Sequence, residues 1–323
     1  MVVREVVFRN SGVTLSGTAY IPSRGNHLPG VVALHGASEP LRSSRVYEHL
    51  REGLPRIGFA VLLFDRRGEG RSSGSRSADY ETLADDAVAG QEALGTIPRL
   101  DPDRIGFWGI SQGGWVAILA ARRSRRPTFA MPVSAPLGTT EYQMEFATSN
   151  MLKIHGYGDH DVKEMLHARR TWLDFMKGNL SLSLTSDVIR RAQRRPWYRL
   201  AFMPKARELE GSRGALKELN FDASRAVEGV SAPLFFIYGG ADPWIPVMES
   251  IAHLRALAGK MPNITYSVIP RANHVMMLNE QERMDFDSKT LNAQGPDAPS
   301  YFMMLGSWLS LQARGRRNQQ PIH

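Results

Sequence analysis

The 323-residue sequence contains no cysteine. A chain without cysteine forms no disulfide, has no thiolate nucleophile and offers no cysteine ligand to a metal. It also contains no uninterrupted run of about 18 apolar residues, the length that a membrane-spanning helix requires, so we expect no membrane span. The stretch 1–8 carries a glutamate and alternates like a strand, unlike a secretory signal. These absences predict a cytoplasmic protein, with an exported protein as the alternative.

Nucleic-acid-binding motifs are also missing, although the net charge is +8 and the pI is near 9.9. The excess is arginine, clustered at 122–126, 190–207 and 314–317. Without a binding motif, such clusters are typical of a solvated basic face, and we expect no nucleic-acid partner. A basic module that binds polyanions is the alternative, and it predicts strongly salt-dependent binding.

A glycine-rich stretch at 65–74 lacks the Gly-Lys-Ser/Thr of a phosphate-binding loop. We therefore interpret it as a packed loop held by Asp65 and Arg66. No cofactor is expected.

Apolar runs alternate with amphipathic segments along most of the chain, and 42% of the residues are hydrophobic. This alternation predicts a mostly parallel sheet covered by helices on both faces. The expected strands cover 2–9, 13–21, 30–35, 59–64, 104–109, 129–134, 234–238 and 264–269. The expected helices cover 43–57, 79–96, a segment ending at 123, 246–258 and 299–313.

One interval is too long for this pattern, because a crossover between parallel strands needs about 30 residues. About a hundred residues separate the strand at 129–134 from the strand at 234–238. We interpret 139–228 as an inserted helical cap, and 1–138 with 229–323 as the core. Aromatic and methionine residues in the insertion would form its own core, and some would also face a substrate. The substrate-pocket candidates are His35, Met144, Trp172, Trp197 and Trp244.

Gly109-Ile110-Ser111-Gln112-Gly113 lies between an apolar strand and an alanine-rich helix. The pattern matches the G-x-S-x-G elbow, in which a serine sits on a sharp strand-to-helix turn. Glycines leave room for so tight a turn, and the helix N-terminus favours negative charge beside the serine. Ser111 is therefore the candidate nucleophile.

A serine nucleophile needs a base, and the base needs a carboxylate to orient it. Asp242 follows the strand at 234–238, and His274 follows the strand at 264–269, so both lie at the carboxyl edge where Ser111 lies. The order Ser, Asp, His is that of elbow hydrolases. Asp242 could also act as a helix N-cap. No standard metal-site spacing occurs in His155–Asp161, which we interpret as a helix-start turn.

Backbone N–H groups after the first buried strand could stabilise an oxyanion. We expect Ala37 as one donor, with Ser38 as an alternative, and the N–H of Gln112 as the other. His35, which precedes this loop, holds the loop or contributes to the pocket.

Five motifs in order resemble the α/β-hydrolase superfamily: Leu34-His35-Gly36-Ala37, Phe64–Ser72, Gly109–Gly114, Gly239-Gly240-Ala241-Asp242 and Ala272-Asn273-His274. The chain looks most similar to bacterial carboxylesterases of the dienelactone-hydrolase and prolyl-oligopeptidase-like branch with a helical cap.

The resemblance implies that Ser111 attacks an ester carbonyl with His274 as base and Asp242 orienting it, and that water releases the acyl-enzyme. It implies a carboxylesterase for short to medium acyl chains, acting on a small ester without a cofactor, as a monomer or homodimer. A peptidase, amidase or thioesterase using the same triad is the alternative, and a non-catalytic binding protein on this fold is a remote one.

Overall fold

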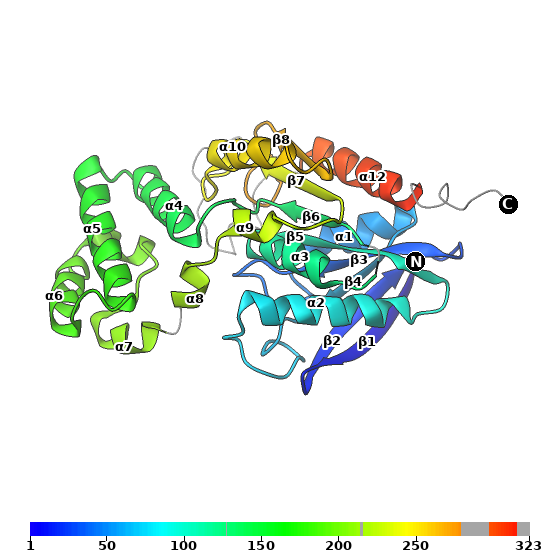
Figure 1. The fold of residues 1–323 in the computed structure, drawn as a ribbon, viewed down its shortest axis with the longest axis horizontal. Helices are drawn as coiled ribbons and strands as arrows, with labels where there is room; N and C mark the ends of the chain where they lie inside the picture. Colours follow the sequence, from blue (N-terminus) through cyan, green and yellow to red (C-terminus); the bar gives the residue numbers. More distant parts are fainter. Residues whose placement is uncertain (127, 214–215, 279–296, 315–323) are drawn as a thin grey trace.

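The computed structural model describes residues 1–323 except 127, 214–215, 279–296 and 315–323. Its described strands form one sheet in the order β1-β2-β4-β3-β5-β6-β7-β8 (Figure 1). The strands are β1 Val2–Asn10, β2 Val13–Ile21, β3 Leu28–Leu34, β4 Ala60–Phe64, β5 Leu100–Ile110, β6 Ala130–Val133, β7 Leu234–Gly239 and β8 Ile264–Ile269. β2 pairs antiparallel with β1 and β4, and the other neighbours are parallel. The predicted mostly parallel α/β fold is confirmed.

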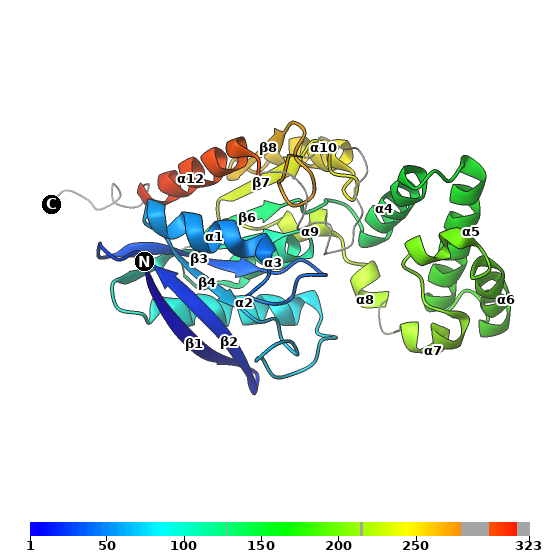
Figure 2. The same ribbon diagram turned by 180° about the vertical axis from the view of Figure 1, so that it is seen from behind.

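Helices cover both faces of the sheet (Figures 1 and 2). Along β3, Val32 and Leu34 face the cluster built with α2 (Tyr80–Gly95), α3 (Gln112–Arg123) and α10 (Val247–Ala258). Val31 and Ala33 face the cluster built with α1 (Glu48–Gly53) and α12 (Pro299–Arg314). A strand buried on both faces explains why its sequence is a continuous apolar run. Among the described residues, no helix has both the length and the apolar character needed to cross a membrane.

The helix expected over 43–57 is broken into three pieces. A 3-10 turn at Arg45–Tyr47 precedes α1, and a second one at Leu54–Ile57 follows it. Pro55 has no N–H to donate to the preceding turn, and Gly58 ends the segment with a φ of 90°. Helical periodicity alone did not reveal this break.

The segment between β6 and β7 forms a separate helical lobe, at the left of Figure 1 and the right of Figure 2. Its helices are α4 Thr140–Ile154, α5 Asp159–Met176, α6 Leu182–Ala192, α7 Leu209–Ser212 and α8 Leu216–Leu219. Residues between Leu152 and Leu209 form a hydrophobic cluster of the lobe's own. The following helix, α9 Ala223–Val227, lies inside the expected insertion, yet its buried residues belong to the α2–α3 cluster of the core.

The two connections of the lobe are tied to each other. Thr140 N donates to Phe221 O at 3.0 Å, and Ala223 N donates to Gly138 O at 3.0 Å. The Phe221 ring lies edge-on to Tyr80 of α2, with ring centres 4.9 Å apart. These contacts fix the point at which the lobe leaves the core.

Helix α4 also contacts the loop that follows β7. Gln143 Nε2 donates to Trp244 O at 3.1 Å, and Asn150 Nδ2 donates to Pro243 O at 3.1 Å. The lobe is therefore anchored beside the carboxyl ends of the strands, next to Asp242.

Three backbone segments meet closely where β5 turns into α3. A Cβ built on Gly109 would lie 2.0 Å from Gly113 O, inside the first turn of α3. A Cβ built on Gly113 would lie 2.4 Å from Leu34 O at the end of β3. Neither distance is compatible with a side chain, so both glycines are required for α3 to begin this close to the two strands.

Gly109→Ala should lower the free energy of unfolding by about 3 kcal/mol or more, because the methyl group meets backbone atoms that have no room to move. Chemical denaturation monitored by circular dichroism would measure the change. Gly53→Ala is the matched control: nothing lies within 4 Å of a Cβ built there, and its helical position should make alanine neutral or stabilising by up to about 1 kcal/mol. Equal stability of the two variants would contradict the packing argument.

Candidate active site

Ser111 occupies the turn between β5 and α3 in a strained conformation, with φ 55° and ψ −123°. A non-glycine residue adopts a positive φ at a cost of about 1–3 kcal/mol, and such residues concentrate at functional sites. The turn is held by Ser111 N, which donates to Val133 O at 2.8 Å. The partly exposed Ser111 therefore stands at the carboxyl edge of the sheet, directly before the N-terminus of α3.

Asp242 and His274 are joined although they are 32 residues apart. His274 Nδ1 lies 2.8 Å from Asp242 Oδ2, and the Asp242 side chain is 0% exposed. The other carboxylate oxygen, Oδ1, accepts the N–H of Trp244 at 2.9 Å. A buried carboxylate at Nδ1 favours the tautomer that carries the proton there and leaves Nε2 to accept one. Helix α10 begins only at Val247, so the alternative of Asp242 as its N-cap is wrong.

The loop that carries His274 is organised by Asn273, the middle residue of the Ala272-Asn273-His274 motif. Asn273 is fully buried, and its Oδ1 accepts the N–H groups of Val275 and Met277, both at 3.0 Å. The loop also meets the one after β7, because Ala241 N donates to Ala272 O at 2.9 Å. The sequence feature that could have indicated this role is the polar residue directly before the candidate base.

The described residues include no hydrogen bond between Ser111 Oγ and the His274 ring. Asp242 and His274 are thus joined, and Ser111 lies at the same sheet edge without a hydrogen bond to the His274 ring. Nucleophile–base hydrogen bonds often tighten only when substrate is bound. The arrangement is compatible with a Ser-His-Asp triad whose last contact forms during the reaction.

The loop after β3 lies beside Ser111, since a Cβ built on Gly36 would be 4.0 Å from Ser111 Cβ. Gly36 N is already engaged, because it donates to Tyr47 OH at 3.3 Å. Within the described residues, the N–H groups of Ala37 and Gln112 have no hydrogen-bond acceptor. These two donors are therefore free to face an oxyanion, as an oxyanion hole requires.

His35 holds its loop and does not line a substrate pocket. Its side chain is buried, its Nε2 lies 2.5 Å from Phe64 O, and its ring packs edge-on against Tyr47 and Phe64. Burial lowers the pKa of His35 to about 4, so the ring is neutral at pH 7. The expectation that His35 contributes to the pocket is corrected, because its buried ring is packed against Tyr47 and Phe64.

Two further pocket candidates belong to the interior of the lobe. Trp172 and Trp197 are buried in the lobe's hydrophobic cluster, so the expectation that they line the pocket is also corrected. Helical spacing could not separate a tryptophan that fills a core from one that faces a ligand. Met144 is partly exposed on α4. Trp244, next to Asp242, packs edge-on against Phe202 of the lobe, with ring centres 5.4 Å apart.

The 65–74 loop is tied down by Asp65, as expected, but by Arg67 in place of Arg66. Asp65 accepts the N–H groups of Arg42 and Arg71, as a loop-holding carboxylate should. The second tie is Arg67, whose Nε donates to buried Asp86 at 2.8 Å. Arg66 instead turns toward α3, where its Nη1 donates to Gln112 Oε1 at 2.6 Å.

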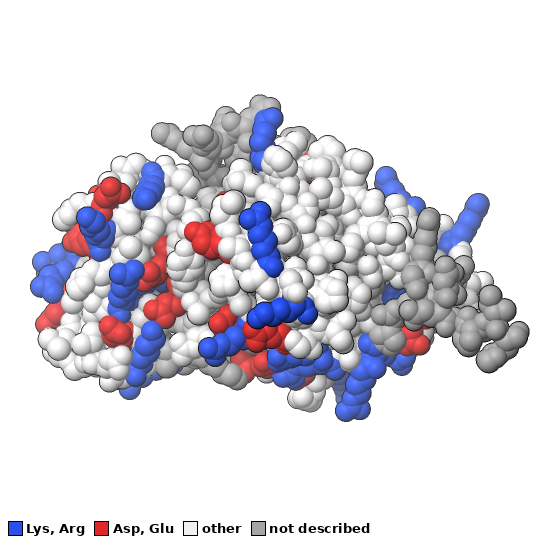
Figure 3. All heavy atoms as spheres, turned by 45° about the horizontal axis from the view of Figure 1, so that its top comes forward, with Lys and Arg blue, Asp and Glu red and all other residues white. Residues whose placement is uncertain are grey.

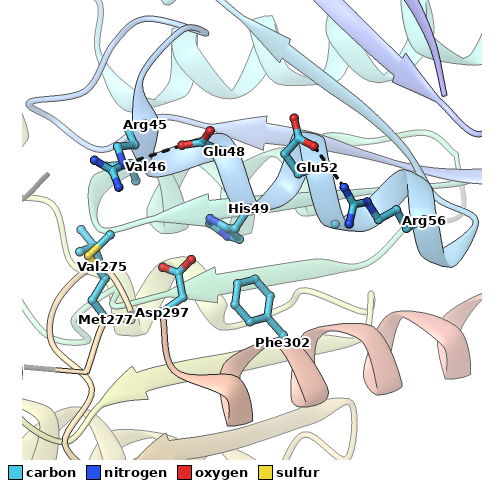
Figure 4. Close-up of a pocket in the computed structure, with 11 residues that line it drawn as sticks. Arg45, Val46, Glu48, His49, Glu52, Arg56, Val275, Met277, Asp297 and Phe302 are labelled. Carbon is cyan, nitrogen blue, oxygen red and sulfur yellow. Dashed lines mark ion pairs between the residues drawn. The ribbon is translucent and has the colours of Figure 1, made fainter. Parts of the chain in front are cut away.

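A cavity of about 390 Å³ lies between α1 and α12, apart from Ser111 (Figure 4). His49 and Phe302 face it, and Val275 and Met277 line it from the loop after His274. Burial lowers the pKa of His49 to about 4. Sequence periodicity does not predict this cavity, because its lining comes from segments far apart in the chain.

Basic side chains are interspersed with acidic ones on the face drawn in Figure 3. Ion pairs join several clustered arginines to carboxylates: Arg123 with Glu81 and Asp85, Arg126 with Asp103, and Arg195 with Asp161 and Glu164. The tail beyond 314 lies outside the described residues. In the described part of the chain, no three metal-ligating side chains gather into a possible ion site. The expected helix start in 155–161 is observed, with α5 beginning at Asp159.

The elbow serine, the Asp242–His274 pair and the mostly parallel sheet define an α/β hydrolase, as the sequence resemblance implies. Residues 26–282 match the hydrolase family described as serine aminopeptidase S33, and the chain belongs to this family. The finer resemblance to the dienelactone-hydrolase and prolyl-oligopeptidase-like branch stays a prediction.

Two relatives match about the same share of the chain. An uncharacterised protein of Mycobacterium tuberculosis is 36% identical over 131 residues, which cover 41% of this chain and 44% of that protein. The thiohydrolase aneE of Aspergillus aculeatus is 30% identical over 145 residues, 44% of each chain. The matched segments thus span less than half the length of these relatives.

Among solved structures, the Pyrococcus furiosus esterase Pf2001 superposes with a TM-score of 0.60 over 96% of this chain and 91% of that one, at 19% identity. At this identity the likeness shows the shared fold.

Asp242→Asn should reduce kcat by about 10³–10⁴-fold, because an amide at this position favours the wrong tautomer of His274. Steady-state kinetics on an ester that the wild type hydrolyses would measure the loss. Asp187→Asn, at an exposed position on α6, is the control and should leave kcat unchanged. A less than tenfold loss in Asp242→Asn would exclude it as the orienting carboxylate.

Stability should fall in acid because of His35. Its folded-state pKa of about 4 lies below the ordinary value of 6.5, so the unfolded chain binds the proton first. The contribution of His35 to the free energy of unfolding is complete above pH 6.5 and declines toward pH 4. It is smaller by about 2 kcal/mol at pH 5 than at pH 8. Urea unfolding at pH 8 and pH 5 would measure the loss of stability between the two pH values. In His35→Gln this loss should be smaller than in the wild type by about 2 kcal/mol. The exposed control His160→Gln should keep the wild-type dependence, and an unchanged dependence in His35→Gln would refute the assignment.

Proposed function

We propose that this hydrolase cleaves carboxylic esters of short to medium acyl chain through a serine acyl-enzyme. The observation that carries the proposal is the 2.8 Å contact between His274 Nδ1 and buried Asp242, at the same sheet edge as the strained Ser111. An oriented imidazole and a serine on an elbow are the two parts that acyl transfer needs.

In the proposed reaction, Ser111 Oγ attacks the ester carbonyl and passes its proton to His274 Nε2. Asp242 stabilises the resulting imidazolium, and the N–H groups of Ala37 and Gln112 hold the oxyanion. His274 then gives the proton to the departing alcohol, which leaves an acyl-Ser111 ester. A water molecule activated by His274 releases the acid and returns the proton to Ser111. All of these groups belong to the chain itself.

Amide or thioester cleavage with the same triad is the second candidate. The family is described as serine aminopeptidase, and the relative from Aspergillus aculeatus is a thiohydrolase. Both reactions pass through an acyl-serine intermediate, so the same residues would serve them. An ester substrate is favoured here by the motif resemblance, and the arginine-rich lobe disfavours long apolar chains.

Hydrolysis of p-nitrophenyl acetate, butyrate, octanoate and palmitate by wild type and Ser111→Ala tests the proposal. We expect activity on the shorter esters and at least a 10³-fold loss in the variant, because the nucleophile is removed. Labelling by a fluorophosphonate probe should also disappear in Ser111→Ala. Activity retained by Ser111→Ala would contradict the serine mechanism. A wild type that labels with the probe but cleaves no ester would favour the amide or thioester reaction.

A further inference from the structure

Arg66 places a positive charge beside the elbow. It follows β4 and Asp65, and its backbone N–H is fixed by a 2.8 Å hydrogen bond to Pro40 O. Its Nη1 lies 2.6 Å from Oε1 of Gln112, the residue after Ser111. A half-buried guanidinium is therefore held at the edge of the sheet at which ester cleavage is proposed.

This charge has no close counterion in the described part of the chain. Neighbouring arginines are paired: Arg67 with Asp86, and Arg42 with Glu5 at 3.0 Å. No described carboxylate lies within 4 Å of the Arg66 guanidinium. Gln112 Oε1 is a neutral acceptor. It occupies one of the five N–H donors of the Arg66 guanidinium. Burial lowers the pKa of Arg66, but an arginine side chain stays charged at neutral pH.

Among the acidic side chains, Glu218 has the largest effect on the pKa of Arg66, and it lies on α8 of the lobe. It raises the pKa of Arg66, and Arg66 in turn lowers that of Glu218, against burial, which raises it. The two groups interact electrostatically across the boundary between core and lobe without forming an ion pair. A partly desolvated cation without a close partner costs free energy that a bound anion would recover.

We propose that Arg66 recognises a carboxylate on the substrate, so that the enzyme prefers esters whose acyl chain ends in a carboxylate. This inference rests on the proposed esterase function. A guanidinium offers two parallel N–H donors to a carboxylate, and such charge-assisted pairs are the strong ones. Glu218 opposes the same carboxylate and limits the preference. Half-esters of linear dicarboxylic acids are the substrate class that fits.

Matched substrate pairs test this preference. Monoethyl glutarate, adipate and suberate would each be compared with the ω-carboxamide of the same length, which is nearly isosteric but neutral. Ethanol release gives kcat/KM for each member. We expect the wild type to prefer the carboxylate of at least one pair by about 10–100-fold, the range of a charge-assisted hydrogen bond.

Three variants separate recognition from positioning. Arg66→Met should collapse the carboxylate-to-amide ratio to about one. Arg66→Lys should retain part of the ratio, because it keeps the charge without the fork. Glu218→Gln should raise the ratio, because it removes the opposing charge. Arg56→Met, at an exposed arginine in the 3-10 turn after α1, is the control and should leave the ratio unchanged. If Arg66→Met does not fold, as judged by circular dichroism, the Arg66→Lys and Glu218→Gln ratios decide the question.

The outcomes distinguish this inference from the proposed function. Hydrolysis of both members of every pair at equal rates would overturn the carboxylate preference and leave the esterase intact. An equal loss on both substrates in Arg66→Met would show that Arg66 only positions Gln112. If no ester of either kind is cleaved and the p-nitrophenyl esters also fail, the esterase function itself is wrong.

Discussion

The close approach of α3 to β5 and β3 is the constraint on which the rest of the site depends. Gly109 and Gly113 leave no space for a Cβ, so the helix begins within van der Waals contact of both strands. This packing pushes Ser111 into a positive-φ conformation and leaves the N–H of Gln112, at the start of α3, beside it. Core packing over the whole sheet therefore supplies the free energy that holds one strained residue.

A second constraint acts on the far side of the site, through the buried carboxylate of Asp242. Its two oxygens are shared between His274 and the N–H of Trp244, which satisfies a charge that would otherwise be costly to bury. The lobe bonds to the same loop through Gln143 and Asn150. The loop that carries Asp242 is thus fixed both by the sheet and by the lobe, so movement of the lobe would shift Asp242 and the His274 ring bonded to it.

Sequence reasoning predicted the sheet well, because burial on both faces demands continuous apolar runs such as 30–34 and 59–64. It also predicted that Asp242 and His274 lie at one edge, since parallel strands end together there. It did not predict that the neighbouring residues Arg66 and Arg67 would have different partners. One pairs with a buried carboxylate on α2 and the other reaches α3, and this choice depends on which helices pack beside the loop.

The sequence by itself determined the order of elements, the position of the elbow and the residues able to form a triad, because local periodicity, turn geometry and strand ends are properties of short segments. Tertiary structure alone decided that Trp172 and Trp197 fill the lobe, that His35 is enclosed, and that α9 packs with the core. These outcomes depend on contacts between segments far apart in the chain, and side-chain type does not specify which surface each residue will meet.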